Sequence, residues 1–322
     1  MKAYVYGANG AAITEVAKPS PKGTQVLVRV HACGLNRADL GMTKGHAHGS
    51  AGGTGTVLGM EWAGEIAEVG PDARGVKPGD KVMGSGSAAF AEYTLADHGR
   101  LYRTPSNMNF EEACTLPIAI STMHNAVVTV SGLQPGQTVM IQGASSGVGL
   151  MALQIAKLKG ASLVVGSSTD AMRRGRLKEF GADLAVDSSD PGWVDQVLQA
   201  TSGEGVDLIV DQVSGRVASQ NLKATRIKGR IVNVGRLGGT HADFNFDLHA
   251  ARRISYIGVT FRSRTIEEIR EIFDEVRKDI WPAVESRKLQ LPIDKVFAFD
   301  DIGKAFEHME ANKHLGKIVV TL

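Results

Sequence analysis

The sequence has few cysteines and no long hydrophobic run. Only Cys33 and Cys114 occur in 322 residues, which argues against a disulfide framework and excludes a four-cysteine zinc lobe. No apolar run approaches the roughly 20 residues of a membrane span. The first residues, MKAYVYG, are typical of a strand rather than of a charged and apolar leader. We therefore expect a cytoplasmic, reducing compartment and no membrane partner.

An excess of charge of one sign is also missing. The chain has 36 Lys and Arg against 34 Asp and Glu, and no long basic run is interleaved with aromatic residues. This balance argues against nucleic acid as the main partner. Hydrophobic residues make up 43% and charged residues 22%, as in an ordinary soluble protein. The length predicts two domains or one elaborated α/β domain.

The pattern of the chain changes near Thr122. Before it, short runs such as QVLVRV and EWAGEIAEVG alternate with Gly/Pro turns, which favours irregular antiparallel β structure. After it, apolar runs of strand length alternate with helical segments; the runs are TVMIQG, SLVVGS, DLAVDS, VDLIVD, RIVNVG and ISYIGV. This alternation predicts an α/β fold with a doubly wound parallel sheet. From Thr265 we expect a long helix, then a last helix capped by Asp300 or Asp301, and a final strand.

The stretch IQGASSGVGLMALQIAKLKGA, from Ile141 to Ala161, combines an apolar strand, a turn of small residues and an amphipathic helix. Small residues let the backbone approach a phosphate, and the N–H groups and dipole at a helix start favour its negative charge. The turn does not spell G-x-G-x-x-G. An unrelated αβ connection is the alternative, but a place at the start of a doubly wound run favours nucleotide binding. The candidate cofactor-binding residues of the turn are Ala144, Ser145, Ser146, Gly147, Val148 and Gly149.

A turn of this kind also fits the short-chain dehydrogenases, which need a Tyr with a Lys four residues later as their proton relay. None of the five tyrosines has that Lys; they are Tyr4, Tyr6, Tyr93, Tyr102 and Tyr256. The turn also lies in the middle of the chain, behind a β-rich region. Both facts count against that class.

Over its whole length the sequence resembles the medium-chain dehydrogenase/reductase superfamily, and within it the zinc-free quinone oxidoreductase family. The matching stretches are VLVRVHACGLNRADL, VLGMEWAGEIAEVG, GVKPGDKVMG, the glycine-rich turn above and ANKHLGKIVVTL. The resemblance implies a GroES-like catalytic β domain at 1–117 and 263–322, and a Rossmann NADP-binding domain at 118–262. The active site would lie in the cleft between them. It also implies a homodimer paired through the edge strand Ile254–Arg262; an edge blunted by the flanking arginines is the alternative.

Zinc alcohol dehydrogenases of this superfamily carry metal ligands at three positions that are Asn36, Met60 and Ile118 here. Catalytic zinc needs three nitrogen, sulfur or carboxylate ligands, and this region supplies at best Glu61. The histidines of GHAHG could chelate an ion, but such a loop is usually solvated, so we expect no metal site. Conjugated acceptors such as quinones, enones and alkenals need a Lewis acid less, because hydride addition spreads the charge over the conjugated system.

The resemblance also implies which residues lie near the chemistry. Asn36 replaces a metal ligand and is the first candidate, with Asp39 as the second; a turn-forming Asn and a loop-fixing Asp are the structural alternatives. Further candidate cofactor contacts are Thr122, Gly235, Arg236 and Arg262. A helix-starting Thr and exposed arginines are the alternatives there. The substrate-loop Tyr of some relatives has no counterpart at Gly41–Gly55, where His46 is a hypothetical replacement donor.

The cofactor is predicted to be NADPH. In ASLVVGSSTDAMRRGRLKEFGAD the second strand of the α/β region ends in Gly166, Ser167 and Ser168, where NAD enzymes place an Asp or Glu for the ribose hydroxyls. Aligned on the family, Ser168 takes the place of this acid and Arg173 that of a nearby Lys, so a cation is supplied for the 2′-phosphate. Asp170 is expected to cap the next helix, whose other basic residues are expected to be solvated.

The sequence therefore predicts an oxidoreductase that uses NADPH to reduce a small conjugated acceptor. One alternative is an enoyl-thioester reductase, which would want a proton donor near the substrate α-carbon and a basic mouth for the carrier; neither is evident. The other is an NADPH-binding protein without turnover, such as a lens-type structural or RNA-associated relative. Binding alone would preserve both the turn and Asn36.

Overall fold

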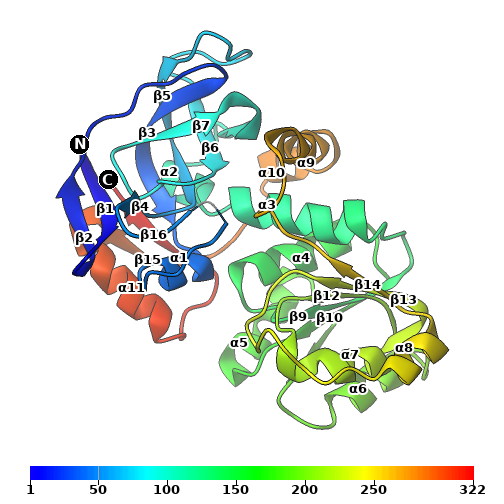
Figure 1. The fold of residues 1–322 in the computed structure, drawn as a ribbon. Helices are drawn as coiled ribbons and strands as arrows, with labels where there is room; N and C mark the ends of the chain where they lie inside the picture. The colour runs from blue at the N-terminus through cyan, green and yellow to red at the C-terminus, as the bar shows by residue number, and fades with distance from the viewer. Residues whose placement is uncertain (50) are drawn as a thin grey trace. The chain divides into compact units, whose positions relative to one another are not determined.

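The computed structural model describes residues 1–49 and 51–322, which fold into two compact units (Figure 1). Met1–Ser121 and Phe261–Leu322 form the N-terminal unit, and Thr122–Thr260 form the central unit. The first and last parts of the chain therefore share one unit, and the central unit is inserted between them.

A six-stranded parallel sheet forms the middle of the central unit. Its strands in spatial order are β11 (Leu184–Val186), β10 (Leu163–Ser167), β9 (Thr138–Gln142), β12 (Val206–Asp211), β13 (Thr225–Asn233) and β14 (Ser255–Gly258). Each strand falls on one of the six apolar runs of the sequence. The order runs outward from β9 to one side and then from β12 to the other, so the predicted doubly wound parallel sheet is confirmed.

Helices cover both faces of this sheet. They are α4 (Gly147–Leu158), α5 (Ala171–Gly175), η3 (Leu177–Phe180), α6 (Trp193–Ala200), η4 (Gly215–Val217), α7 (Ala218–Ala224) and α8 (Phe246–Arg252). In Figure 1, α4 lies on one face and α6 and α7 lie on the other. Because both faces are covered, β12 is buried at every position.

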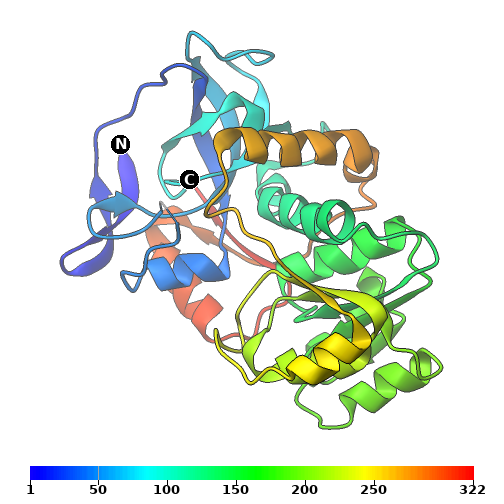
Figure 2. The same ribbon diagram turned by 45° about the vertical axis from the view of Figure 1, so that its right-hand side comes forward.

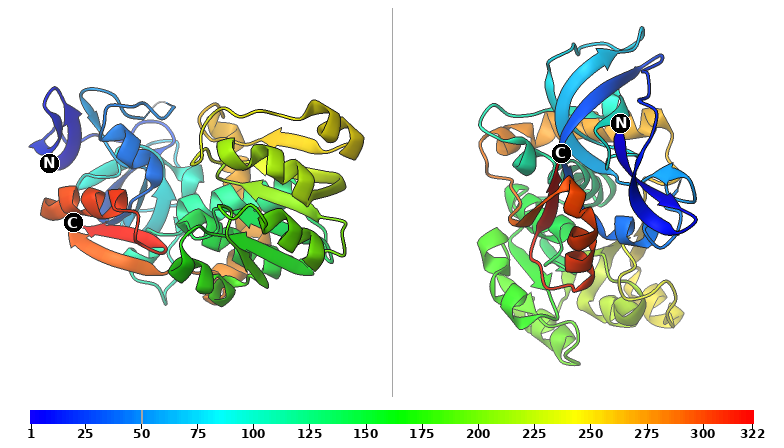
Figure 3. Two further views of the ribbon diagram at one scale, coloured as in Figure 1. Left: turned by 90° about the horizontal axis from the view of Figure 1, so that it is seen from below. Right: turned by 90° about the vertical axis from the view of Figure 1, so that its left-hand side faces the viewer.

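Two sheets, antiparallel in all but one of their strand pairs, dominate the N-terminal unit. One is a three-stranded sheet of β2 (Gly10–Glu15), β1 (Lys2–Gly7) and β4 (Thr56–Val57). The other has the order β15 (Ile293–Ala298), β16 (Lys317–Thr321), β3 (Gln25–Gly34), β5 (Glu61–Val69), β6 (Lys81–Ser85) and β8 (Leu101–Arg103), with β7 (Tyr93–Asp97) also paired to β3. In its register Val319 of β16 lies opposite Gly34 of β3. The last strand, red in Figure 3, therefore returns to the blue N-terminal strands.

The helices of the N-terminal unit are short except for one. They are α1 (Arg37–Met42), η1 (His98–Arg100), α2 (Phe110–Ala113), α9 (Ile266–Asp279), α10 (Trp281–Glu285), η5 (Phe299–Asp301) and α11 (Ile302–Glu310). The single helix expected after Thr265 is divided into α9 and α10 (Figure 2). Pro282 explains the division, because a proline has no N–H and its ring clashes with the carbonyl four residues earlier. Asp301 stands at the start of α11, but its side chain makes no capping bond.

One helical stretch joins the two units along the chain. It contains α2, α3 (Pro117–His124) and the π-helix η2 (Asn125–Val130). Together they make Phe110–Val130, a stretch that is long and apolar enough to cross a membrane by length and composition, contrary to the expectation from the sequence. Of its most apolar window, 72% is buried inside the protein, as in the core helix of a soluble protein.

Candidate functional site

The glycine-rich turn lies between β9 and α4, as the sequence predicts. Ser146 is the N-cap of α4, and its Oγ accepts a hydrogen bond from the Gly149 N–H at 3.1 Å. A Cβ on Gly149 would lie 2.6 Å from the Gly143 carbonyl oxygen, so this third position of the motif needs glycine for close packing. Ala144 is buried at the first position and donates its N–H to the Ser167 carbonyl. The turn therefore keeps the shape of the dinucleotide-binding motif, although only one of the three motif positions is a glycine.

The hydrogen bonds of the turn separate ligand-facing groups from supporting ones. The N–H groups of Ala144, Ser146 and Gly149 have acceptors within the turn or on β10. Among the described residues, those of Ser145, Gly147 and Val148 have no acceptor and stand at the start of α4. The latter three groups can therefore bind an anion through the backbone.

Two serines at the end of β10 play different parts. The Ser167 side chain is fully buried; it donates to Gln142 Oε1 at 2.6 Å and accepts from the Gly143 N–H at 3.0 Å. It ties β10 to the turn and presents no hydroxyl to a ligand. Ser168 donates to the Ser145 hydroxyl at 3.0 Å, which links the end of β10 to the ligand-facing part of the turn. The structure therefore brings Ser168 and Ser145 together at this edge of the sheet.

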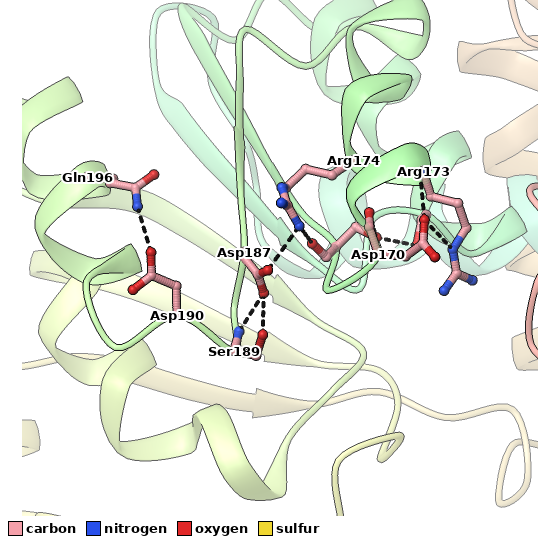
Figure 4. A network of polar contacts seen from close by, with 9 residues as sticks. Asp170, Arg173, Arg174, Asp187, Ser189, Asp190 and Gln196 are labelled. Atoms are coloured by element: carbon pink, nitrogen blue, oxygen red, sulfur yellow. Dashed lines mark hydrogen bonds and ion pairs between the residues drawn. The ribbon is translucent and has the colours of Figure 1, made fainter.

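The arginines after β10 also differ (Figure 4). Asp170 caps α5 as expected, accepting the Arg173 N–H at 2.8 Å, and this backbone hydrogen bond lowers the pKa of its carboxyl. Arg174 donates to the Ser168 carbonyl at 2.8 Å and to Asp187 Oδ2 at 3.0 Å. Figure 4 shows the Arg173 guanidinium turned away from that pair, with its Nε 3.6 Å from Asp170 Oδ1. Arg174, expected to be solvated, instead fixes the backbone of Ser168.

The remaining candidates of the central unit come from α3 and from the chain just after β13. Thr122 is inside α3 rather than at its start. A Cβ on Gly235 would lie 2.6 Å from the Gln212 carbonyl oxygen. Glycine at this position therefore lets the loop after β13 approach the loop after β12 closely. Arg236 is exposed and lines a hollow of about 660 Å³. Its other lining side chains include His241, His249, Phe244, Phe246 and Tyr256.

Asn36, Asp39 and Arg262 belong to the N-terminal unit. Asn36 precedes α1 in an extended conformation, and its side chain enters a buried polar cluster with Glu61 and Lys317. Lys317 Nζ lies 2.5 Å from Glu61 Oε2 and 2.9 Å from Asn36 Oδ1, and Asn36 Nδ2 lies 3.0 Å from Glu61 Oε2. We call Asn36, Glu61 and Lys317 the buried cluster. Asn36 remains partly exposed, whereas Glu61 and Lys317 are buried.

Asp39 supports the buried cluster from α1. Its Oδ2 accepts the Asn36 backbone N–H at 2.7 Å, and its Oδ1 is buried without a hydrogen-bond partner among the described residues. Burial raises the pKa of Asp39 to about 7, against the lowering effect of the Asn36 N–H and of Lys317. Because Asp39 is fully buried, it supports Asn36 and does not itself present a surface to a ligand.

Asn36 stands at one of the three positions where the resemblance to zinc alcohol dehydrogenases implies a metal ligand, and the chemistry of the buried cluster around it does not fit the metal. Met60 and Ile118 provide no ligand, and the Ile118 N–H instead donates to Glu61 Oε1 at 2.6 Å. The carboxylate of Glu61 is thus occupied by an ammonium, an amide and a backbone N–H. Within residues 1–49 and 51–322 no group of three or more His, Cys, Asp and Glu side chains could hold a metal ion.

Sequence reasoning missed Lys317, although its segment contributed to the resemblance. Lys317 on β16 and Glu61 on β5 are 256 residues apart, and they meet because β3 pairs with both of these strands. The signal available in the sequence was a lysine inside an apolar strand, GKIVVTL, which is unusual because a buried ammonium needs a partner.

Comparisons with known proteins agree with this geometry. The family model described as "Alcohol dehydrogenase GroES-like domain" matches residues 22–106, and the one described as "Zinc-binding dehydrogenase" matches residues 147–278. A solved structure, an alcohol dehydrogenase superfamily protein from Novosphingobium aromaticivorans, superposes with a TM-score of 0.89 at 28% identity, covering 100% of this chain and 99% of that one.

Two curated relatives match along almost the whole chain. Quinone oxidoreductase-like protein 2 of Mus musculus is 30% identical over 312 residues, covering 96% of this chain and 88% of that protein. A phenolphthiocerol/phthiocerol polyketide synthase of Mycobacterium tuberculosis is 29% identical over 312 residues, but the match covers only 14% of that protein. The chain thus spans a small part of the polyketide synthase. It belongs to the quinone oxidoreductase family of the medium-chain dehydrogenase/reductase superfamily, a family of oxidoreductases that bind a nicotinamide dinucleotide.

Proposed function

We propose that this protein reduces quinones or other conjugated carbonyl acceptors, such as enones and alkenals, with NADPH and without a metal ion. The buried cluster carries the proposal, because Lys317 Nζ lies 2.5 Å from the one carboxylate that could have been a zinc ligand. An alkoxide product needs a Lewis acid to hold its charge, whereas an enolate or hydroquinone anion spreads that charge and is stabilised by ordinary hydrogen bonds. The small conjugated acceptor is therefore the proposed partner.

The glycine-rich turn supports the binding of the cofactor. The N–H groups of Ser145, Gly147 and Val148 would hold the pyrophosphate at the start of α4. NADPH, when bound, supplies the hydride. The protein's own contribution is to fix the direction of approach, which accounts for much of the acceleration in such reactions.

The end of β10 supports NADPH over NADH. The residue that follows the strand is Ser168 rather than an acid, and Arg173 stands outside the Arg174–Asp187 pair. A carboxylate at the place of Ser168 would repel the 2′-phosphate, whereas a guanidinium forms a charge-assisted hydrogen bond with it.

The Arg173→Ala variant tests the cofactor proposal. We expect it to lose about one to two powers of ten in NADPH affinity, since a charge-assisted bond is worth roughly 1.5 to 3 kcal/mol. NADH affinity should hardly change, because NADH has no phosphate at this place. Dissociation constants from nucleotide fluorescence give the answer, with Arg176→Ala as the control because Arg176 is exposed and paired with Glu179 at 3.0 Å. Equal weakening of both cofactors would contradict the proposal.

The identity of the acceptor is tested by measuring the rate of NADPH oxidation with a panel of quinones, enones, alkenals and enoyl thioesters. Each rate is measured with and without a chelator. We expect turnover of quinones or enones that the chelator does not reduce. Loss of activity to the chelator and its return with zinc would refute a metal-free reaction. Binding of NADPH without turnover of any acceptor would favour a non-catalytic binding protein.

One observation favours an enoyl-thioester reductase as the second candidate. A polyketide synthase matches along 96% of this chain, and polyketide synthesis proceeds on thioester-bound intermediates. The panel separates the two, because a thioester reductase would prefer an enoyl thioester to the matching free enone.

We also propose that the protein works in the reducing cytoplasm, as a homodimer, without nucleic acid or membrane as a partner. Cys33 and Cys114 are both free and buried, which suits a compartment where thiols stay reduced. Burial raises the pKa of both thiols, so neither has the character of a reactive thiolate.

A further inference from the structure

The hollow of about 660 Å³ in the central unit is lined by residues that the proposed function does not use. It lies where α7, α8 and the loop after β13 meet the strands β13 and β14 (Figure 1). None of the turn residues that would hold the pyrophosphate lines it, and neither Ser168 nor Arg173 does. Its volume is in the range of pockets that bind small molecules. The hollow is therefore a candidate binding site separate from the glycine-rich turn.

Most of the wall of the hollow is apolar and aromatic. Ala218 and Ile254 are its buried apolar residues. The ring of Phe244 stands at the centre of the aromatic part, with its centroid 4.9 Å from that of Phe246 and 5.9 Å from that of Tyr256, both in edge-to-face geometry. Rings arranged in this way offer faces and edges to a further flat ring. The wall therefore suits a ligand with a flat aromatic part.

The polar side chains of the hollow favour an anion. Arg236 is exposed, its Nη1 donates to the Val234 carbonyl at 3.3 Å, and its other N–H groups have no acceptor among the described residues. His241 and His249 also line the hollow, and no acidic side chain is among its described lining residues. A guanidinium with free N–H groups matches the two oxygens of a carboxylate. The charge and the hydrogen-bond donors therefore point to a carboxylate.

Hydrogen bonds tie the loop after β13 to the elements beside the hollow. The Gly238 N–H donates to the Val213 carbonyl at 2.6 Å, and Ser219 Oγ donates to the Asp243 carbonyl at 2.8 Å. A Cβ on Gly215 would clash with the Gly238 carbonyl oxygen, so glycine lets the loop approach η4 closely. Because the loop is already anchored at two places, a ligand does not have to order it, which lowers the cost of binding.

We propose that the hollow binds a small aromatic carboxylate. The rings of Phe244, Phe246 and Tyr256 would pack against its flat part, and Arg236 would bind its carboxylate. All of these residues belong to the central unit, so the site needs nothing from the N-terminal unit. The resemblance implies a cofactor contact for Arg236, whereas this site gives its side chain a different ligand. The proposal goes beyond the proposed function, because it concerns neither the nicotinamide cofactor nor the acceptor that is reduced.

Two probe molecules test the ring and the charge separately: 2-naphthoate and its uncharged amide, 2-naphthamide. Titration calorimetry with the 322-residue chain measures the affinity of each, with and without saturating NADPH. We expect 2-naphthoate to bind at one site and the amide to bind about ten- to a hundredfold more weakly, since it lacks the charge-assisted hydrogen bonds. NADPH should not change either affinity.

Two variants locate the binding. Arg236→Gln should weaken 2-naphthoate by about ten- to a hundredfold and leave the amide unchanged. Phe246→Ser should weaken both probes alike, and its folding cost is small because Phe246 is 75% exposed. Lys223→Gln is the control, because it removes one positive charge from an exposed position of α7 outside the hollow. Thermal unfolding checks that each variant is folded.

Four results would overturn the proposal. No detectable binding of 2-naphthoate at millimolar concentration would mean that the hollow does not take this class of ligand. An affinity for 2-naphthoate that Arg236→Gln leaves unchanged would place its binding elsewhere. Displacement of 2-naphthoate by NADPH would make the hollow part of the cofactor site. Binding that disappears at protein concentrations where light scattering shows a dimer would make a second copy of the chain the occupant.

Discussion

Asp39 is a carboxyl group buried beside the cation and the carboxylate of Lys317 and Glu61. Burial raises the pKa of Asp39 to about 7 from an ordinary 3.8. The thiol of Cys33 also lies near Asp39, whose charge raises the pKa of that thiol further. A raised pKa means that the folded protein binds this proton more tightly than the unfolded chain. The contribution to stability is therefore complete below about pH 4 and is lost as the pH rises through 7.

The pH dependence of stability tests this prediction. Between pH 5 and 8 the free energy of unfolding of the wild type should fall by roughly 2 to 4 kcal/mol relative to Asp39→Asn, since one pKa unit corresponds to about 1.4 kcal/mol. The variant keeps an oxygen that accepts the Asn36 N–H but does not titrate. Urea unfolding at the two pH values gives the comparison. Parallel pH profiles for both proteins would show that Asp39 does not titrate in this range.

Gly34 is required for space rather than for an unusual backbone angle. A Cβ at this position would lie 2.6 Å from the Cys114 carbonyl oxygen and would also crowd the buried cluster. We expect Gly34→Ala to lower the free energy of unfolding by about 1 to 3 kcal/mol, as overpacking does. Gly303→Ala in α11 is the control: nothing lies within 4 Å of its Cβ position, and alanine favours a helix. A variant at Gly34 as stable as the control would contradict the crowding.

At the scale of elements, an ion pair between Arg270 and Asp97 links α9 to the strand β7. Arg270 donates to Asp97 through Nε at 2.8 Å and through Nη2 at 2.6 Å. Burial alone would raise the pKa of Asp97, but the hydrogen bonds from Arg270, Thr24 and the Gly99 N–H outweigh it and lower the pKa to about 2. The stabilisation is therefore present above about pH 4 and is lost as the pH falls toward 2.

Asp97→Asn should lower the free energy of unfolding by about 1 to 3 kcal/mol at pH 7, because it leaves the guanidinium without its counter-charge. The difference from the wild type should shrink as the pH approaches 2. Chemical unfolding at pH 7 and pH 3 measures both effects, and Asp274→Asn on the exposed face of α9 serves as control. A loss of the same size at both pH values would mean that the titration of Asp97 has no part in it.

Helices, strands and turns could be predicted from the sequence wherever the pattern that indicates them lies within a short stretch of neighbouring residues. The six apolar runs gave the parallel strands, and small residues between a strand and a helix gave the turn that starts at Gly143. What could not be predicted depends on contacts distant in the chain. Lys317 meets Glu61 only because β3 pairs with both β16 and β5. Ser167 turns inward because Gln142 and the Gly143 N–H form hydrogen bonds with its hydroxyl. Arg173 and Arg174 look equivalent in sequence but have different partners in space.

At the scale of the whole molecule, the edge strand β14 predicts self-association. It ends the order of the parallel sheet, so one of its edges has no neighbouring strand among the described residues. Tyr256 is 39% exposed on it, and Phe246, the first residue of the preceding helix α8, is 75% exposed. Of the flanking arginines, Arg252 is turned back to the Thr225 carbonyl at 2.7 Å, whereas Arg253 is exposed close to the start of the strand. An unpaired strand edge with an exposed aromatic side chain favours pairing with a second copy.

We therefore expect a homodimer paired through β14 at micromolar concentration, as measured by light scattering. Tyr256→Lys puts a charge on the edge and should shift the protein toward the monomer, because two like charges would meet across the twofold axis. Ile227→Lys is the matched control, since Ile227 is also exposed, at 52%, but lies on β13. A monomeric wild type would contradict the dimer. A Tyr256→Lys protein that stays dimeric would place the interface away from β14, on a surface that its sequence pattern did not indicate.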